Sequence, residues 1–246
     1  MKRIFTFAAF LIACMSATFA QYMPSEKGSV FTYESKNFEQ DKTETYTATV
    51  DDVTTDASGV VTVSVIERHT VEGSFLGEVE QNSTYTYNPE TKLTENVVMT
   101  AEEFKRQSMI SIREMFAQMG QYPTDDDMAQ VDKMFKPKGN ITIPLPAKVT
   151  EGESFANSAI RANMMGQSMG MKLGKGSYVG YEDVEVPAGT YNCLKLTYTI
   201  TFIGEQVPDM KVTAWYAPGV GLVKQLAADK KGKEISVDVL KSISKE

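Results

Sequence analysis

The sequence predicts a mainly β (α+β) protein, built as a single curved antiparallel sheet or half-barrel. A two-helix insertion, over about residues 101–119 and 124–135, is expected to pack on the concave face of this sheet. Segments with an apolar residue at every second position recur along the chain, and short turn sequences rich in Asp, Asn, Pro and Gly separate them. The period becomes helical after Thr100. Without a linker or a change of composition, we expect one β-rich domain over residues 21–246.

Residues 1–20 have the pattern of a secretory signal peptide. A basic head is followed by an apolar stretch from Ile4 to Met15 and by small residues at positions 18 and 20. We expect cleavage after Ala20 and export to the periplasm or the extracellular space. In the alternative interpretation Leu11 to Cys14 is a lipobox, which would make Cys14 the lipidated first residue of a lipoprotein. The apolar stretch is too short for a membrane span, so we do not expect an integral membrane protein.

Charge and cysteine content exclude several classes of protein. The formal net charge is −7, and removal of the basic head would make it more negative. Nucleic acids and anionic membranes both require a basic surface, so we expect neither as a partner. Cys193 is the one cysteine after the leader, which leaves no internal disulfide. We interpret it as a small buried hydrophobic residue rather than a reactive thiol.

The N-terminal half predicts one strand followed by two hairpins. Asp56 to Gly59 and Asn88 to Thr91 carry the turn residues of these hairpins. The expected strands cover residues 29–38, 43–53, 60–71, 83–87 and 93–99. Hairpins joined in sequence order favour an antiparallel meander.

Two amphipathic helices follow the second hairpin. Thr100 and Glu103 have the spacing of a capping box, and Gly120 and Pro123 end the first helix. Thr124 can cap the second helix, where three aspartates suit the positive N-terminal end. The predicted apolar stripe of the first helix is Phe104, Ile112, Met115, Phe116 and Met119, with Met109 at its edge; that of the second is Met128, Val131, Met134 and Phe135.

The C-terminal half returns to the β pattern. Strands are expected over 141–145, in a Met-rich hairpin over 160–173, in four segments between Tyr178 and Lys224, and over 235–243. Pro187 and Gly189 mark one tight turn and Asp229 to Gly232 another. A helix through Ala159 to Met165 is the alternative for the Met-rich hairpin.

Candidate catalytic and metal residues are few. His69 is the single histidine and lies one period-two step from Glu67, as a general base might require, but no nucleophile or orienting partner is identifiable. We therefore interpret it as a structural or surface histidine. Asp125 to Asp127 lack the spacing of a calcium loop, and one histidine with one cysteine leaves no zinc ligand set. Phosphate-binding, dinucleotide-binding and nucleophile-elbow motifs are absent. We expect no catalytic residue, no metal, no cofactor and no enzymatic activity.

Methionine is the unusual feature of the composition, because ten of the fourteen methionines lie between Met99 and Met171. The simplest interpretation is ordinary core between helices and sheet. Methionines also line adaptable apolar pockets, and those at 164, 165, 169 and 171 could in principle hold Cu(I). An apolar pocket would be lined by Phe104, Ile112, Met115, Phe116, Met119, Met128, Met164, Met169 and Met171.

Two motifs in the C-terminal half resemble a known family. They are VPAGTYNCLK at residues 186–195 and WYAPGVGLVK at residues 215–224. Together they resemble a secreted family of unknown function grouped as TapB-like, and the hairpin at 160–173 is similar to its sequences from Bacteroidetes. The resemblance implies a curved antiparallel sheet in the cell envelope, loosely similar to the half-barrels of lipoprotein carriers. It points to no catalytic residue, and a fold does not establish a function.

These observations lead to two functional hypotheses. The first is a non-enzymatic exported protein that binds a lipid, another apolar small molecule or an envelope protein between the sheet and the Met-rich helices. The second is a structural or adhesion-type envelope module with a solid core and no ligand pocket, which would pair through an apolar patch or a strand edge.

Overall fold

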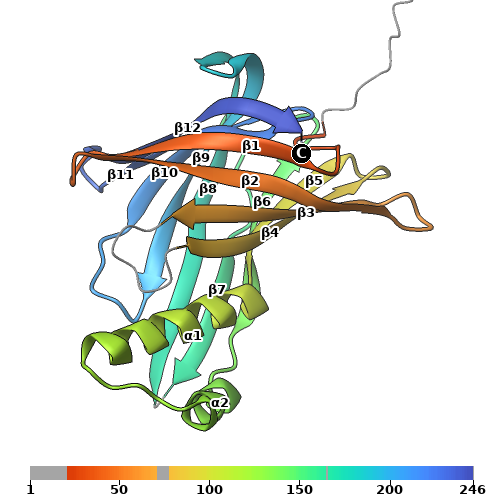
Figure 1. Ribbon diagram of the computed structural model, residues 1–246. Coiled ribbons are helices and arrows are strands. Elements are labelled where there is room, and N and C mark those ends of the chain that lie inside the picture. Colours follow the sequence, from red (N-terminus) through yellow and green to blue (C-terminus); the bar gives the residue numbers. More distant parts are fainter. Residues whose placement is uncertain (1–20, 71–77, 165, 246) are drawn as a thin grey trace, which may run out of the picture.

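A computed structural model describes residues 21–70, 78–164 and 166–245 (Figure 1). The expected signal peptide, its cleavage site, Cys14 and Met165 lie outside these residues. The described chain forms twelve strands and two helices. Their bounds are β1 Ser29–Asn37, β2 Lys42–Thr55, β3 Val61–Thr70, β4 Glu78–Asn88, β5 Leu93–Thr100, α1 Ala101–Gln118, α2 Asp125–Met134, β6 Lys138–Pro146, β7 Ser158–Met164, β8 Gln167–Val186, β9 Gly189–Ile203, β10 Met210–Ala217, β11 Gly221–Ala228 and β12 Glu234–Lys245.

The sheet is a closed antiparallel barrel in which every strand pairs with its neighbours in sequence and β1 pairs with β12. The closing seam runs from Ser29 opposite Lys245 to Asn37 opposite Ser236, with one irregularity between Thr32 and Tyr33. The prediction of an open curved sheet or half-barrel is therefore wrong. Closure pairs the backbone N–H and C=O groups that the first and last strands of an open sheet would leave exposed.

The predicted meander and its turns are confirmed. The Asp56 carboxylate accepts hydrogen bonds from the backbone N–H of Ser58 at 2.8 Å and of Val60 at 3.1 Å between β2 and β3. Asn88 caps the β4–β5 turn in the same way, and Asp229 caps the β11–β12 turn. Short polar side chains that bind their own turn explain why these turns can be identified from sequence. The hairpin at 160–173 is also confirmed, as β7 and the start of β8.

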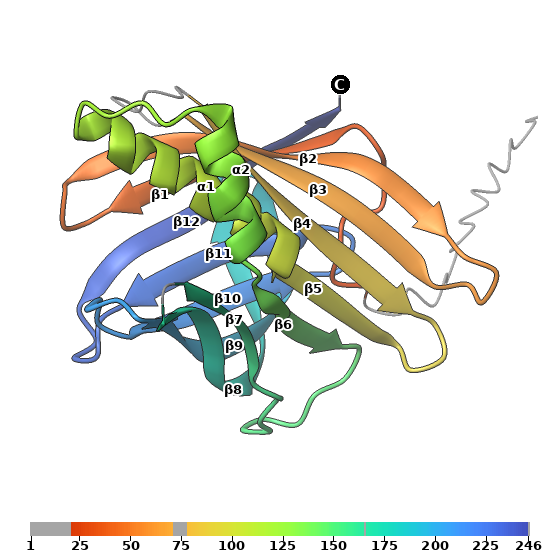
Figure 2. The ribbon, with the colours of Figure 1, turned by 90° about the horizontal axis from the view of Figure 1, so that it is seen from below.

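Side chains from the strands themselves fill most of the barrel. The largest fully buried ones include Ile141, Ile143 and Leu145 of β6 and Leu240 of β12. The interior therefore has no room for a helical layer. The predicted helices do form, but Figures 1 and 2 show them at one end of the barrel rather than on a concave sheet face. Met115 is 50% exposed, which agrees with this placement and contradicts the packing that we expected.

Glu103 attaches the start of α1 to the barrel. Its backbone N–H donates to Thr100 Oγ1 at 3.0 Å, which confirms the predicted N-cap. Its buried carboxylate accepts hydrogen bonds from Asn82 Nδ2 of β4 at 3.0 Å, from Arg106 Nη2 at 2.6 Å and from Gln107 Nε2 at 3.0 Å. Arg106 and Gln107 also donate to the backbone carbonyl of Glu80 on β4. This network anchors the first turn of α1 to the edge of the barrel mouth.

The second helix is joined to the first by one aromatic contact and two ion pairs. The rings of Phe104 and Phe135 lie 5.9 Å apart. Lys105 Nζ is 2.8 Å from Asp132 Oδ2, and Arg113 Nη2 is 2.9 Å from Asp125 Oδ1. The helix begins with a complete capping box between Thr124 and Asp127, beyond the simple cap that the sequence predicts. The helices are thus held near their ends, with a space left between them.

The Glu103 network predicts a specific dependence of stability on pH. Burial raises the pKa of the Glu103 carboxyl, but hydrogen bonds from Arg106, Asn82 and Gln107 outweigh it and lower the pKa from 4.5 to about 2. Because the folded value lies below the unfolded one, this stabilisation is present above pH 4.5 and is lost as the pH falls toward about 2. We expect Glu103→Gln to reduce the free energy of unfolding at pH 7 by roughly 2 kcal/mol.

Chemical denaturation of the native protein and the variant from pH 7 to pH 2 measures both effects, and the difference between the two proteins should shrink in the acidic range. Glu102→Gln is the control, since Glu102 is an exposed glutamate in the same helical turn. Equal stabilities of the native and Glu103→Gln proteins at pH 7 would contradict this account of the network.

Candidate functional site

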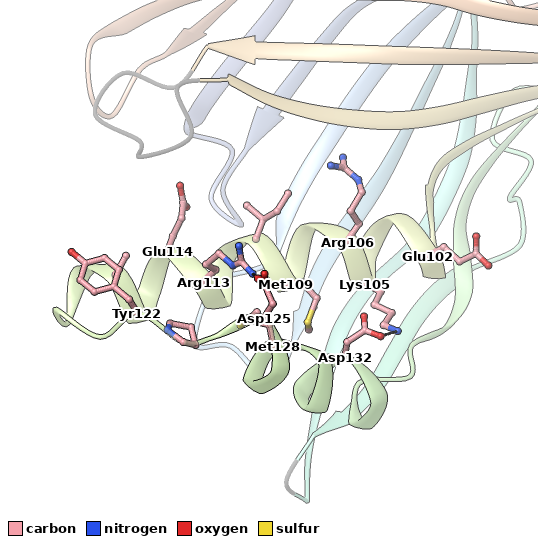
Figure 3. A pocket seen from close by; sticks show the side chains of 14 residues that line it. Glu102, Lys105, Arg106, Met109, Arg113, Glu114, Tyr122, Asp125, Met128 and Asp132 are labelled. Carbon is pink, nitrogen blue, oxygen red and sulfur yellow. Dashed lines mark hydrogen bonds and ion pairs between the residues drawn. The ribbon is translucent and has the colours of Figure 1, made fainter.

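The space between α1 and α2 is an apolar groove with a volume of about 830 Å³. Figure 3 shows Met109 pointing from α1 toward α2, where it lies near Met128. The other apolar side chains of the groove are Ile110, Ala117, Tyr122, Pro123 and Ala129. Volumes of this size are common for small-molecule sites, which usually combine an apolar lining with a few polar groups.

Charged side chains line the rim of this groove. They are Glu102, Lys105, Arg106, Arg113, Glu114, Asp125 and Asp132. Two of the cations, Lys105 and Arg113, are paired with carboxylates of the facing helix, and Arg106 is paired with Glu103. Arg106 and Glu114 point away from α2 in Figure 3. The charges of the rim therefore bind mostly one another and leave the floor of the groove apolar.

The structure separates most of the nine residues predicted to line an apolar pocket. Met128 lies in the groove and is 7% exposed. Phe104 and Met171 pack against the barrel core. Ile112, Phe116, Met164 and Met169 are half-buried outside the groove lining, and Met115 and Met119 are exposed. The groove is lined by the face of α1 next to the predicted apolar stripe. Met109, which the sequence analysis placed at the edge of that stripe, is the residue that could have indicated this position.

A second hollow of about 290 Å³ lies inside the barrel. Glu67 and His69 of β3 and Asp238 of β12 line it. The other polar lining residues are Ser35, Gln81, Ser83, Asn96, Gln225 and the tyrosines Tyr33, Tyr46, Tyr85, Tyr198 and Tyr216. The side chains of Glu67 and His69 are 28% and 39% exposed, so this hollow opens to solvent beside the end of β3. Sequence reasoning paired Glu67 with His69 on one strand face, but it did not connect them with Asp238.

Three stacked rings form one wall of the barrel cavity. The Tyr33 and Tyr46 rings are 5.0 Å apart and nearly parallel, and the Tyr46 and His69 rings are 4.4 Å apart. His69 Nε2 lies 3.6 Å from Glu67 Oε2. The recorded neighbours of this histidine are thus an aromatic ring and a carboxylate, not the hydroxyl or thiol that nucleophilic catalysis requires.

Comparison with known proteins identifies the family. The model of the DUF3108-like family matches residues 70–240, well over half of the sequence. The chain belongs to the DUF3108-like family. The TapB-like grouping that the two motifs suggest is not confirmed. No curated protein matches this chain.

Two solved structures share the fold of this DUF3108-like chain. One is from Parabacteroides distasonis and is described as a candidate lipoprotein, with 17% identity, a TM-score of 0.64 and coverage of 92% of this chain and 99% of that one. The other, from Bacteroides fragilis, is described as a candidate exported protein with a YmcC-like fold, with 16% identity, a TM-score of 0.62 and coverage of 92% and 100%. At these identities the likeness establishes the fold alone.

The electrostatics of the barrel cavity in this DUF3108-like chain are those of buried acidic groups. Burial raises the pKa of Asp238, and the nearby Glu67 raises it further, against a hydrogen bond from Ser35 and the attraction of His69. Burial also raises the pKa of Tyr33 and Tyr46, and the charges of Glu67 and Asp238 add to the effect. Lys and Arg are absent from the described residues that line the cavity.

Two buried side-chain oxygens of β5 have no hydrogen-bond partner among the described residues of this DUF3108-like barrel, Thr94 Oγ1 and Asn96 Oδ1, and of these two residues only Asn96 lines the cavity. Asn96 is 5% exposed, and its Nδ2 donates to the Tyr216 hydroxyl at 3.3 Å. Its Oδ1 accepts no hydrogen bond, although Asn96 lines the cavity. Such an atom loses the hydration it would have in water and gains nothing in return.

Neither a metal-binding cluster nor a membrane-spanning helix is found in the described part of this DUF3108-like chain. It contains no group of three or more His, Cys, Asp or Glu side chains arranged to hold a metal ion. None of the described helices is long and apolar enough to cross a membrane.

Cys193 of this DUF3108-like chain is buried on β9, and its thiol contacts the backbone carbonyl of Tyr191. Burial, together with the charges of Glu182 and Asp183, raises the pKa of the thiol from 9.0 to about 12. Because the thiolate is the reactive form, we expect alkylation by iodoacetamide at pH 8 to be roughly a thousandfold slower in the native chain from Gln21 onward than in guanidinium. Mass spectrometry of timed samples measures both rates, and rapid labelling of the native chain would contradict the buried position.

Proposed function

We propose that this DUF3108-like protein is an exported, non-enzymatic binding protein of the cell envelope. Its ligand is an apolar small molecule held in the groove between α1 and α2. The observation that carries this proposal is the apolar floor of that groove, about 830 Å³ in volume, enclosed by charged side chains that are already paired.

The composition of the groove favours an apolar ligand. Met109 and Met128 face each other across it (Figure 3), and thioether side chains adapt their shape to different apolar partners. Each charge brought near the floor by a polar ligand would lose hydration without a free counter-ion, because Lys105 and Arg113 are held by Asp132 and Asp125. Hydrocarbon surface has no charge hydration to lose there, and its burial against the apolar lining is favourable.

The surroundings of the groove are apolar as well. Met115, Met119, Tyr122 and Met134 are 50%, 56%, 78% and 59% exposed. They account for half of the strongly exposed large apolar side chains in the described chain. Such concentrations of exposed apolar surface mark interaction sites in soluble proteins. A protein partner that covers these residues is the second candidate function, and the exposure of Met115 and Met119 favours it.

The closed sheet supports the ligand-binding role over a module that assembles through strand edges. In the described barrel each strand has a neighbour on both sides, so little free strand edge remains for strand addition, the exception being β6 beyond Asn140, where its pairing with β7 ends. The absence of enzymatic activity is supported by the environments of His69 and Cys193. The histidine contacts a ring and a carboxylate, and the cysteine is a buried thiol with a raised pKa.

Export is supported by the character of residues 1–20 and by the relatives. The basic head, apolar stretch and small residues before position 21 have the order of a signal peptide. The two structural neighbours are described as a candidate lipoprotein and as a candidate exported protein, neither assignment being established in the description. Cleavage after Ala20 and lipidation at Cys14 remain the two modes of processing, and the mass of the N-terminal peptide from isolated envelopes distinguishes them.

The neutral fluorescent probe N-phenyl-1-naphthylamine tests the groove. We expect the native protein to bind it and Met109→Glu to weaken binding by about tenfold or more, since the new carboxylate must be desolvated in the apolar floor. Met115→Glu is the matched control, because Met115 lies on the same helix, is half exposed and is outside the groove lining. The titration is followed by fluorescence, with circular dichroism as a check that both variants fold.

Three outcomes would contradict the proposal. The native protein could fail to bind the probe at any concentration below its solubility limit. The two variants could bind it equally well. Met115→Glu could be the more damaging change, which would move the apolar site to the exposed patch and favour the protein partner. Native mass spectrometry of gently purified protein adds an independent readout, because an apolar ligand from the host should remain bound.

A further inference from the structure

The barrel cavity is more polar than the groove, and the two share no lining residue. Its polar lining consists of carboxylates, amides, hydroxyls and tyrosine rings with one histidine, whereas the groove floor is built from methionine, isoleucine and alanine. Its volume of about 290 Å³ restricts any occupant to a small molecule.

We propose that this cavity binds a small organic cation through a primary ammonium group, with Glu67 and Asp238 as counter-ions and Asn96 Oδ1 as a hydrogen-bond acceptor. The tyrosine rings complete the site as an aromatic cage. The ligand is thus an alkylammonium compound and is distinct from the apolar ligand of the groove.

Charge is the first step in this inference. Two carboxylates, Glu67 and Asp238, face the cavity, while the described lining residues include neither Lys nor Arg. The imidazole of His69 lies 3.6 Å from Glu67. Two carboxylates elsewhere in the barrel do have a cation beside them: Glu34 is 2.9 Å from Lys241, and Glu182 is 3.2 Å from Lys195. The missing cation in the cavity is therefore supplied by a ligand.

Hydrogen bonding is the second step, and it selects the type of cation. Asn96 lines the cavity, and its carbonyl oxygen is buried and has no donor among the described residues. A ligand that carries N–H groups can satisfy this oxygen and a carboxylate at once, which a quaternary ammonium group cannot do. Leaving such an acceptor unpaired is unfavourable, so a ligand with an N–H donor has an advantage over one without.

The aromatic lining is the third step. Tyr33, Tyr46, Tyr85, Tyr198 and Tyr216 come from five different strands and converge on one space. The Tyr33 hydroxyl is held by the carbonyl of Leu222 at 2.7 Å and the Tyr198 hydroxyl by Gln225 at 3.2 Å, so these rings are fixed. Rigid rings beside carboxylates are the recurrent environment of bound ammonium groups.

Access is the fourth step. The side chains of Glu67 and His69 are partly exposed, whereas Asn96 is deeply buried. A ligand can therefore enter beside β3 and extend its ammonium group toward the interior. This route does not pass through the groove lining, because the two sets of lining residues have no member in common.

The proposal is tested with n-butylammonium, by isothermal titration calorimetry and saturation-transfer NMR on the chain from Gln21 onward. We expect saturable binding, no detectable binding of the neutral analogue 1-butanol and weaker binding of tetramethylammonium, which lacks N–H donors. Glu67→Gln and Asp238→Asn should each weaken binding of n-butylammonium by about tenfold or more, the loss expected for one hydrogen bond to a charged group.

Glu34→Gln is the matched control. It removes the same charge from neighbouring strand β1, where Glu34 pairs with Lys241 and lies outside the cavity lining. Binding should change by less than about twofold, since a diffuse attraction to an acidic protein is weak and is screened by salt. Met109→Glu should also leave ammonium binding intact, so that failure of the groove proposal and failure of this one are distinguishable.

Several results would overturn the inference. They are the absence of n-butylammonium binding at millimolar concentration, equal affinity for 1-butanol, and equal losses in Glu34→Gln and Glu67→Gln. Tetramethylammonium bound as tightly as n-butylammonium would overturn the role of Asn96. Thermal melts accompany each titration, and Glu67→Gln in particular changes a partly exposed side chain, so its fold should survive.

Discussion

The pairing of β1 with β12 is the constraint on which the rest of the structure depends. With this seam in place, the barrel has an interior that is separated from its surface, and side chains from opposite ends of the chain face one another. Glu67 and Asp238 face one cavity only because the last strand returns to the first. Closure also forces the helical insertion out of the sheet, because the interior is already occupied by strand side chains.

Two chemically different hollows follow from this arrangement. Inside the barrel, alternation places every second side chain of β3 in the interior, and toward the end of that strand valines give way to Glu67 and His69. Outside it, two helices fastened near their ends by ion pairs leave an apolar floor between them. The first hollow is bounded by paired strands of the barrel, whereas the second is bounded by two helices that are joined through side-chain contacts.

Local chemistry explains which features the sequence could predict. Asp56 and Asn88 bind their own turns, and Thr100 and Thr124 bind the first turns of their helices, so these interactions lie within a few residues. Closure could not be inferred in this way, since Ser29 and Lys245 are distant in sequence and a paired edge has the same alternation as a free one. The position of the groove could not be predicted for a related reason. The partners of Lys105 and Arg113, Asp132 and Asp125, belong to the second helix, and the spacing within one helix does not indicate how two helices face each other. Tyrosines that converge from five strands likewise share no local pattern in the sequence.

The helical insertion leaves the barrel and returns to it at the same point. Thr100, the last residue of β5, is paired directly with Asn140 of β6, so the ends of the excursion are already adjacent and hydrogen-bonded. Residues between them can lengthen, shorten or be exchanged while β5 and β6 keep their register. The barrel can therefore tolerate changes in the length and sequence of this insertion without any change in the pairing of the strands that carry it.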